Sequence, residues 1–215
     1  ARTRKAVDYQ PDALIKNSGE AVGDYTGDSV YDVSGALAPK WQTVASNVTA
    51  TYNVIVQNDG NVDDTFKITG PEPSSGWDLV YSHVDGATVT DITADVESTA
   101  GWVTPTALAP NETVEFRIDV TPDDTVAGDA VLEVVLRADS VADSGKKDGV
   151  LAKTTKLAVV APDAAVRKAG DPTYTGDGEI NTTGLNQSVG DKVARDHAAV
   201  YDIEVQNDGN VADWF

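Results

Sequence analysis

Acidic and amide side chains gather in short stretches that could bind a cation, because carboxylate and carbonyl oxygens are the ligands that Ca²⁺ prefers. One stretch is "QNDGNVDD" (57–64), which lacks the alternating carboxylates and distant glutamate of an EF-hand loop and also suits a hairpin turn. The other, "YTGDSVYD" (25–32), returns as "YTGDGEIN" (174–181). Glycine and aspartate are also typical of plain turns, so both readings stay open. The candidate calcium ligands are Asp28, Asp32, Asp177 and Glu179.

Four asparagines begin Asn-x-Ser/Thr sequons, the acceptor sequence for N-glycosylation. They are Asn47, Asn111, Asn181 and Asn186. Modification at these sites implies a secreted, surface-exposed chain.

Residue patterns for catalysis are missing from the sequence. It has no cysteine, no glycine-rich phosphate loop, no HExxH and no serine elbow, so we expect a protein that is not an enzyme and needs no cofactor, calcium aside. An isopeptide bond between a lysine and an asparagine is conceivable in a cysteine-free chain, but the sequence gives no way to choose the pair. Trp77 and Trp102 each follow a glycine and could stack on sugars, although core or sheet-end positions suit them better.

The composition narrows the class of partner. A net charge of −19 opposes binding to nucleic acid or to anionic membrane surfaces. The hydrophobic fraction of 40% is enough for a core, yet no apolar run is long enough to cross a membrane. These numbers predict an acidic protein with no membrane insertion in this segment. The extracellular or cell-surface location is expected from the sequons and from the absence of cysteine and methionine.

A long internal repeat organises the chain. "VQNDGNVDDTF" (56–66) returns as "VQNDGNVADWF" (205–215), about 150 residues later, with nine of eleven positions identical. Residues 1–13 also resemble residues 152–164, which end one unit and begin the next. The sequence therefore predicts a closing strand of a preceding repeat at 1–10, a complete repeat at 11–161, and the N-terminal part of a further, truncated repeat at 162–215.

Strands dominate the predicted secondary structure, because apolar and polar residues alternate in most segments. "TYNVIVQ" buries Tyr52, Val54 and Val56, and its second copy keeps that face apolar. "VEFRIDV" (114–120) alternates in the same way, and "VLEVVLRA" (131–138) suits a central strand. We expect Asn58–Asn61 to close a tight hairpin, and the fold to be all-β: tandem Ig-like antiparallel β-sandwich repeats of about 150 residues, with roughly seven to ten strands each.

The junction between the two units has no glycine or serine spacer. We expect Thr154–Val160 to end one unit as an extended strand and Pro162 to mark a semi-rigid joint.

Strand–"QNDGN"–strand, followed by "GWDLVY", a second "GW", "LAPNETVEFRIDVTP" and "KKDGV", resembles repeats of large secreted bacterial surface proteins, among them cell-adhesion-related β-sandwich domains. "LAPNETVEFRIDVTP" is also similar to a non-catalytic β-sandwich attached to secreted glycosidases. The resemblance implies an extracellular tandem β-sandwich and supplies no catalytic residues.

Two functions are compatible with these patterns. The first is a structural one, in which the chain is the repeat unit of a cell-surface stalk, fibre or filament with a spacing or adhesion role. Its partners are then neighbouring repeats or subunits of the same protein. The alternative is a non-catalytic glycan-binding or accessory module of a secreted enzyme.

Overall fold

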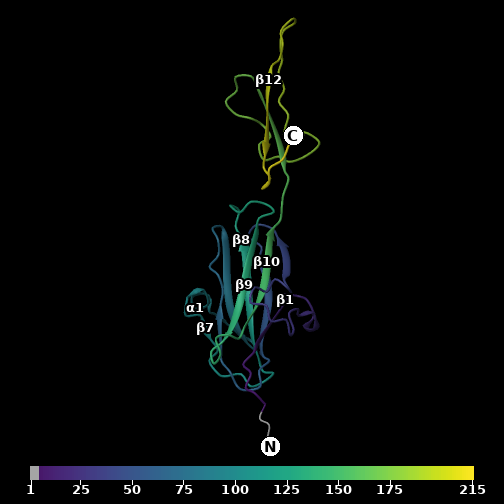
Figure 1. Ribbon diagram of the computed structural model, residues 1–215. Coiled ribbons are helices and arrows are strands. Elements are labelled where there is room, and N and C mark those ends of the chain that lie inside the picture. Colours follow the sequence, from purple (N-terminus) through teal and green to yellow (C-terminus); the bar gives the residue numbers. More distant parts are fainter. Residues whose placement is uncertain (1–4) are drawn as a thin grey trace, which may run out of the picture. The chain divides into compact units, whose positions relative to one another are not determined.

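The computed structural model describes residues 5–215, so the part of the predicted closing strand at 1–4 lies outside the described residues. The chain divides into two compact units (Figure 1). Unit 1 comprises the described residues up to Val126 together with Ala130–Leu157. Unit 2 comprises Ala127–Asp129 and Ala158–Phe215. Each unit is described separately below.

Unit 1 contains two five-stranded sheets. Sheet A has the strand order β1 (Pro11–Asn17), β3 (Ala50–Asn58), β8 (Thr113–Pro122), β5 (Trp77–Asp85) and β6 (Thr88–Asp91). Sheet B has the order β2 (Lys40–Val44), β10 (Lys147–Lys156), β9 (Val131–Ser140), β4 (Phe66–Thr69) and β7 (Trp102–Val103). Ten strands agree with the expected range, and β9 is a central strand as predicted.

The core lies between the two sheets, where alternate residues of each strand meet. Tyr52, Val54 and Val56 are 0%, 0% and 1% exposed, which confirms the face predicted to be buried. The apolar face of β8, from Val114 to Val120, is buried as well. The Tyr52 hydroxyl donates to the Lys153 carbonyl across the sandwich over 2.6 Å. An all-β sandwich is therefore the fold of unit 1.

Three features differ from the sequence-based expectation. The turn at Asn58–Asn61 does not close a hairpin, because β3 pairs with β1 and β8 while β4 pairs with β7 and β9 in the other sheet. One strand pair is parallel, β2 with β10, so sheet B is mixed. Two short helices also interrupt the strands, η1 (Val22–Asp24, a 3₁₀ turn) and α1 (Thr93–Glu97).

Unit 2 contains a two-stranded antiparallel sheet of β11 (Pro162–Lys168) and β12 (Tyr201–Asn207). Its seven residue pairs, from Pro162 opposite Asn207 to Lys168 opposite Tyr201, have the same register as β1 with β3 in unit 1. No helix among residues 5–215 is long and apolar enough to cross a membrane.

The last strand of unit 1 ends earlier than predicted. β10 stops at Lys156, and the Leu157 N–H bonds to the Val44 carbonyl over 2.7 Å. Residues 157–161 form no strand, and Pro162 is the first residue of β11. The strand predicted for Thr154–Val160 is therefore wrong after Lys156, since the backbone beyond it bonds to a turn of unit 2.

Candidate functional site

The repeated motif forms a turn that is braced from within by a buried asparagine. Asn58 is fully buried, and its Nδ2 donates to the carbonyls of Val62 (2.8 Å) and Leu108 (2.7 Å). Its Oδ1 accepts the Gly60 N–H over 2.9 Å. Every polar atom of this amide therefore has a partner, as a buried polar side chain requires. These hydrogen bonds fix the conformation of the turn, and with it the backbone groups on its outer surface.

That outer surface holds the segment that leads into β1. The Asp59 N–H donates to the Gln10 carbonyl over 2.8 Å, and the Asn61 N–H donates to the Asp8 carbonyl over 2.9 Å. The Asn61 side chain accepts the Asp8 N–H in return. Residues 5–10 form no strand in either sheet, so this turn fixes their path together with an ion pair between Asp8 and Lys146.

Unit 2 repeats the arrangement with the corresponding residues. The Asp208 N–H donates to the Ala161 carbonyl over 2.8 Å, and the Asn210 N–H donates to the Val159 carbonyl over 3.0 Å. The Asn210 side chain accepts the Val159 N–H over 2.7 Å. The "QNDGN" motif thus has the same task in both copies: it holds the approaching chain by backbone and amide hydrogen bonds.

Buried carboxylates anchor the "YTGDSVYD" loop of unit 1. Asp12 and Asp148 are both 0% exposed. Asp12 Oδ2 accepts the Ser29 N–H over 3.0 Å, and Asp148 Oδ1 accepts the Asp32 N–H over 2.8 Å. Asp148 Oδ2 accepts the Ala13 N–H over 2.6 Å. The loop is therefore fastened to β1 and β10 through aspartates that the sequence patterns did not single out.

Burial controls the protonation of these two aspartates. The pKa of Asp12 is raised to about 7, mainly by loss of hydration, with smaller contributions from the carboxylates of Asp59, Asp148 and Asp28 and against the lowering effect of the Ser29 N–H. Loss of hydration also raises the pKa of Asp148 to about 6, against the lowering effect of its backbone hydrogen bonds. Asp12 Oδ1 finds no hydrogen-bond partner among residues 5–215. A proton on this pair relieves the cost of burying two like charges.

The four candidate calcium ligands do not converge. Asp28 is exposed, and Asp32 accepts hydrogen bonds from Ser34 and Leu37 inside its own loop, with a lowered pKa caused first by the Ser34 hydroxyl. Asp177 and Glu179 are exposed in unit 2. Within the described part of the chain, no group of three or more His, Cys, Asp or Glu residues is placed to hold a metal ion. Calcium binding stays a prediction.

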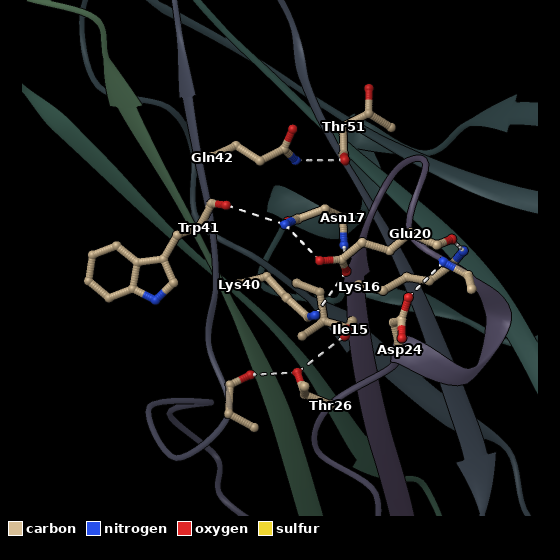
Figure 2. A network of polar contacts seen from close by, with 12 residues as sticks. Ile15, Lys16, Asn17, Glu20, Asp24, Thr26, Lys40, Trp41, Gln42 and Thr51 are labelled. Carbon is tan, nitrogen blue, oxygen red and sulfur yellow. Dashed lines mark hydrogen bonds and ion pairs between the residues drawn. The ribbon is translucent and has the colours of Figure 1, made fainter.

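A polar network joins the edge strands of the two sheets of unit 1 (Figure 2). Glu20 lies at its centre. Its Oε2 accepts the Lys40 Nζ and the Asn17 N–H, each over 2.8 Å, and its Oε1 accepts the Asn17 Nδ2 over 3.2 Å. Asn17 ends β1 and Lys40 begins β2, so one carboxylate connects sheet A to sheet B.

The charged side chains of this network are only partly exposed to solvent. The side chains of Lys40 and Glu20 are 14% and 31% exposed. The hydrogen bond from Lys40 is the first cause of a lowered pKa at Glu20, so the two groups form an ion pair. Asn17 Oδ1 is buried and has no hydrogen-bond partner within residues 5–215. An amide oxygen left unpaired in this way is uncommon in folded proteins.

Unit 2 has different groups at the corresponding edge. Lys168 takes the place of Asn17 at the end of the first strand and pairs with Asp191 over 3.3 Å. Arg167, in the place of Lys16, donates to the Asp171 carbonyl and lies over the Tyr174 ring at 4.5 Å. The edge is thus polar in both units. Among these positions, only in unit 1 do an amide and an amine donate to the same carboxylate.

The aromatic side chains do not form a common binding face. Trp77 is 9% exposed at the start of β5, and Trp102 lies against Phe116 and His83 with ring centroids 5.5 Å and 4.9 Å away. These positions agree with the core and sheet-end prediction. Trp41 is 58% exposed on β2, and the Lys153 Nζ lies over its ring at 4.5 Å. A hollow of about 360 Å³ next to His83 is lined mainly by polar groups, including Asp85, Thr106 and Glu115.

All four sequon asparagines are exposed. Asn47, Asn111 and Asn186 have positive φ angles of 59°, 68° and 62°, and therefore stand at turns. Glycosylation stays a prediction.

The protein is thus an all-β sandwich protein. In it the repeated turn holds the segment that leads into the first strand of each unit. No protein-family model matches the chain, and no curated protein matches it in sequence. Similar solved structures include a FixG-related protein from Vibrio parahaemolyticus, with 10% identity over 68% of this chain and 95% of that chain and a TM-score of 0.37. A family 123 glycoside hydrolase from Clostridium perfringens matches with 6% identity over 69% of this chain and 27% of that chain, at a TM-score of 0.42. A chaperone–tip adhesin complex of CFA/I fimbriae matches with 9% identity over 80% of this chain and 68% of that chain, at a TM-score of 0.30. Likenesses this distant carry no argument for function.

Proposed function

We propose that the chain is a structural, non-enzymatic segment of an extracellular protein, a repeat unit of a cell-surface stalk, fibre or filament that spaces or presents other parts. The observation that carries this proposal is the repeated turn of the "QNDGN" motif. Asn58–Asn61 and Asn207–Asn210 hold the segment that leads into the first strand of each unit, with equivalent hydrogen bonds in both. A motif that fixes the approach to every unit is what a load-carrying tandem protein needs.

The bonds of the connecting segment support a stiff joint. The Leu157 N–H bonds to Val44 in unit 1, and the Val159 N–H bonds to the Asn210 side chain in unit 2. One residue, Ala158, stands between these two anchored positions. We propose that so short a connection limits independent rotation of the units.

Distance distributions between the units test this proposal. The chain has no cysteine, so Thr88→Cys in unit 1 and Thr182→Cys in unit 2 give a unique pair of sites for spin labels. We expect a narrow distribution of label-to-label distances, and a broader one after Asn210→Ala, which removes the acceptor for the Val159 N–H. Asp63→Ala, at an exposed position where the second copy of the motif already has Ala212, is the matched control and should leave the distribution narrow. A distribution that is already broad in the parent protein would contradict a stiff stalk.

The alternative, a glycan-binding accessory module, has weaker support. It needs exposed aromatic rings beside a cleft. Trp77 and Trp102 pack inside unit 1, and the ring of Trp41 carries Lys153 on its face. The hollow beside His83 is the place where this alternative can be tested, by titrating neutral oligosaccharides against the His83 ring resonances.

A further inference from the structure

The edge network of unit 1 brings an amine and a primary amide to the same carboxylate. Lys40 Nζ and Asn17 Nδ2 donate to the two oxygens of Glu20, over 2.8 Å and 3.2 Å (Figure 2). A deprotonated amine is a nucleophile, and an amide carbon is an acyl centre that it can attack when the two are held together. We propose that Lys40 and Asn17 form an intramolecular isopeptide bond, with Glu20 as the proton carrier.

The reaction balances without any added reagent. The Lys40 ammonium gives a proton to the Glu20 carboxylate and becomes a neutral amine. Its Nζ then attacks Asn17 Cγ, so that a Cγ–Nζ bond forms. The Cγ–Nδ2 bond breaks as Nδ2 takes a proton from Glu20, and ammonia leaves. The proton that remains from Nζ leaves with the ammonia as ammonium, and the Glu20 carboxylate is restored.

The surroundings of Asn17 suit this role. Its Oδ1 is buried and accepts no hydrogen bond within residues 5–215. That oxygen gains negative charge during attack, and the proton that Glu20 carries neutralises this charge when it passes to Nδ2 and the carbonyl re-forms. In the resting ion pair the pKa of Glu20 is lowered by Lys40, so proton transfer within the pair must come before attack. The low exposure of Lys40, 14%, limits competition from water for that proton.

The bond would have a clear structural consequence. It joins the last residue of β1, at the edge of sheet A, to the first residue of β2, at the edge of sheet B. It also closes the long loop between them, in a protein that has no cysteine for a disulfide. This inference does not depend on the proposed stalk function, because the chemistry is set by unit 1 alone.

Unit 2 provides an internal control. Lys168 occupies the position of Asn17, and its partner is the carboxylate of Asp191. That pair has no primary amide, so it cannot release ammonia.

Mass spectrometry of the denatured full chain tests the proposal. We expect a mass lower than that of the sequence by one ammonia. Trypsin normally cuts after Lys40, and the next basic residue is Lys67. With the bond in place cleavage after Lys40 is blocked, and residues 17–67 stay together in one fragment. The lysine-containing peptides of unit 2 should have their unmodified masses.

Conservative variants separate the roles. Lys40→Arg keeps a cation for Glu20 but has no nucleophilic amine, and Asn17→Ala has no acyl group, so both should have the full sequence mass. Glu20→Gln should also abolish the ammonia loss, because it cannot carry the proton. An unmodified mass in the folded parent protein would overturn the proposal and leave Lys40–Glu20 as an ion pair. An ammonia loss with normal cleavage after Lys40 would also overturn it, because that combination is the sign of asparagine cyclisation.

Discussion

Gly60 stands where a side chain does not fit. A Cβ at this position would collide with the Asp8 carbonyl oxygen and would lie 2.8 Å from Asn58 Oδ1. The φ angle of Gly60 is not in the left-handed region, so the requirement is one of space. Gly209 meets the carbonyl of Val159 in the same way in unit 2. This glycine is therefore a condition for holding the entry segment.

Gly60→Ala tests that condition. We expect the free energy of unfolding of unit 1 to fall by about 1–3 kcal/mol, because backbone on both sides must shift to admit a methyl group. Gly23→Ala is the matched control, since nothing lies within 4 Å of a Cβ there. Urea denaturation of both variants measures the difference, and equal stabilities would contradict the close approach.

The buried carboxyls Asp12 and Asp148 make unit 1 sensitive to pH. Their pKa values are raised from 3.8 to about 7 and about 6, so the folded state favours the protonated form more than the unfolded chain does. Their contribution to stability is complete below the ordinary pKa of 3.8 and is lost as the pH rises through about 6 and then about 7. We therefore expect the free energy of unfolding to decrease from pH 5 to pH 8.

Asp12→Asn removes the larger of the two effects. The amide keeps an oxygen that can accept the Ser29 N–H but has no proton to lose in this range. Urea midpoints measured across the same pH range should vary less in the variant than in the parent protein. An unchanged pH profile would show that Asp12 does not titrate there.

Sequence patterns locate some of these residues and miss others. The alternation at Tyr52–Val56 is visible because a half-buried strand imposes a period of two on side-chain polarity. Burial of Asp12 is invisible, since an aspartate after a proline is also a common turn residue. The convergence of Asn17, Glu20 and Lys40 depends on how β1 and β2 meet at the edges of two sheets, which residue types and spacing do not encode.

At the scale of elements, Lys156 secures the connection between β8 and β9. Its side chain is 0% exposed at the end of β10, and its Nζ donates to the carbonyls of Asp123 (2.8 Å) and Val126 (2.5 Å). A buried ammonium needs such partners to offset its loss of hydration. β10 thus holds the turn beyond β8 as well as its neighbouring strands.

Lys156→Met should lower the free energy of unfolding by about 2–4 kcal/mol, because it leaves those carbonyls unpaired in the interior. Lys153→Met is the control on the same strand. Lys153 pairs with the exposed Glu133 and lies over the exposed Trp41 ring, and loss of such surface contacts costs about 1 kcal/mol or less. Thermal or urea unfolding followed by tryptophan fluorescence measures both. Similar losses in the two variants would contradict a special role for Lys156.

The errors of prediction at this scale have a common origin. Asp-Gly between two alternating runs predicts a hairpin, yet the Asn58–Asn61 turn leads from sheet A to sheet B. The turn chemistry is local and was identified correctly as a turn; the sheet that each strand joins is decided by contacts far along the chain. The parallel pairing of β2 with β10 was missed for the same reason, since "KWQTV" gives no sign of its partner.

At the scale of the whole molecule, the two units use equivalent strands in different surroundings. Tyr52, Val54 and Val56 of β3 are almost fully buried. The corresponding Tyr201, Ile203 and Val205 of β12 are 37%, 72% and 54% exposed. β3 has β1 on one side and β8 on the other, whereas β12 is paired with β11 in a two-stranded sheet. Burial of this apolar face therefore depends on which strands flank it, because the side chains themselves are of the same kind.

A peptide with the sequence of β8, residues 113–122, should consequently pair with β12. In unit 1 β8 places Ile118, Phe116 and Val114 opposite Tyr52, Val54 and Val56 in antiparallel register. The same register on β12 would pair the edge that β11 does not occupy among residues 5–215, and would cover part of its apolar face. We expect the peptide to slow hydrogen exchange of the β12 amides and to leave β3 unchanged, since both sides of β3 are occupied. A control peptide with serine in place of Phe116 and Ile118 keeps the backbone donors but loses the apolar contacts, and should protect far less. Equal protection by both peptides, or by neither, would contradict the idea that β12 keeps the pairing preference of β3.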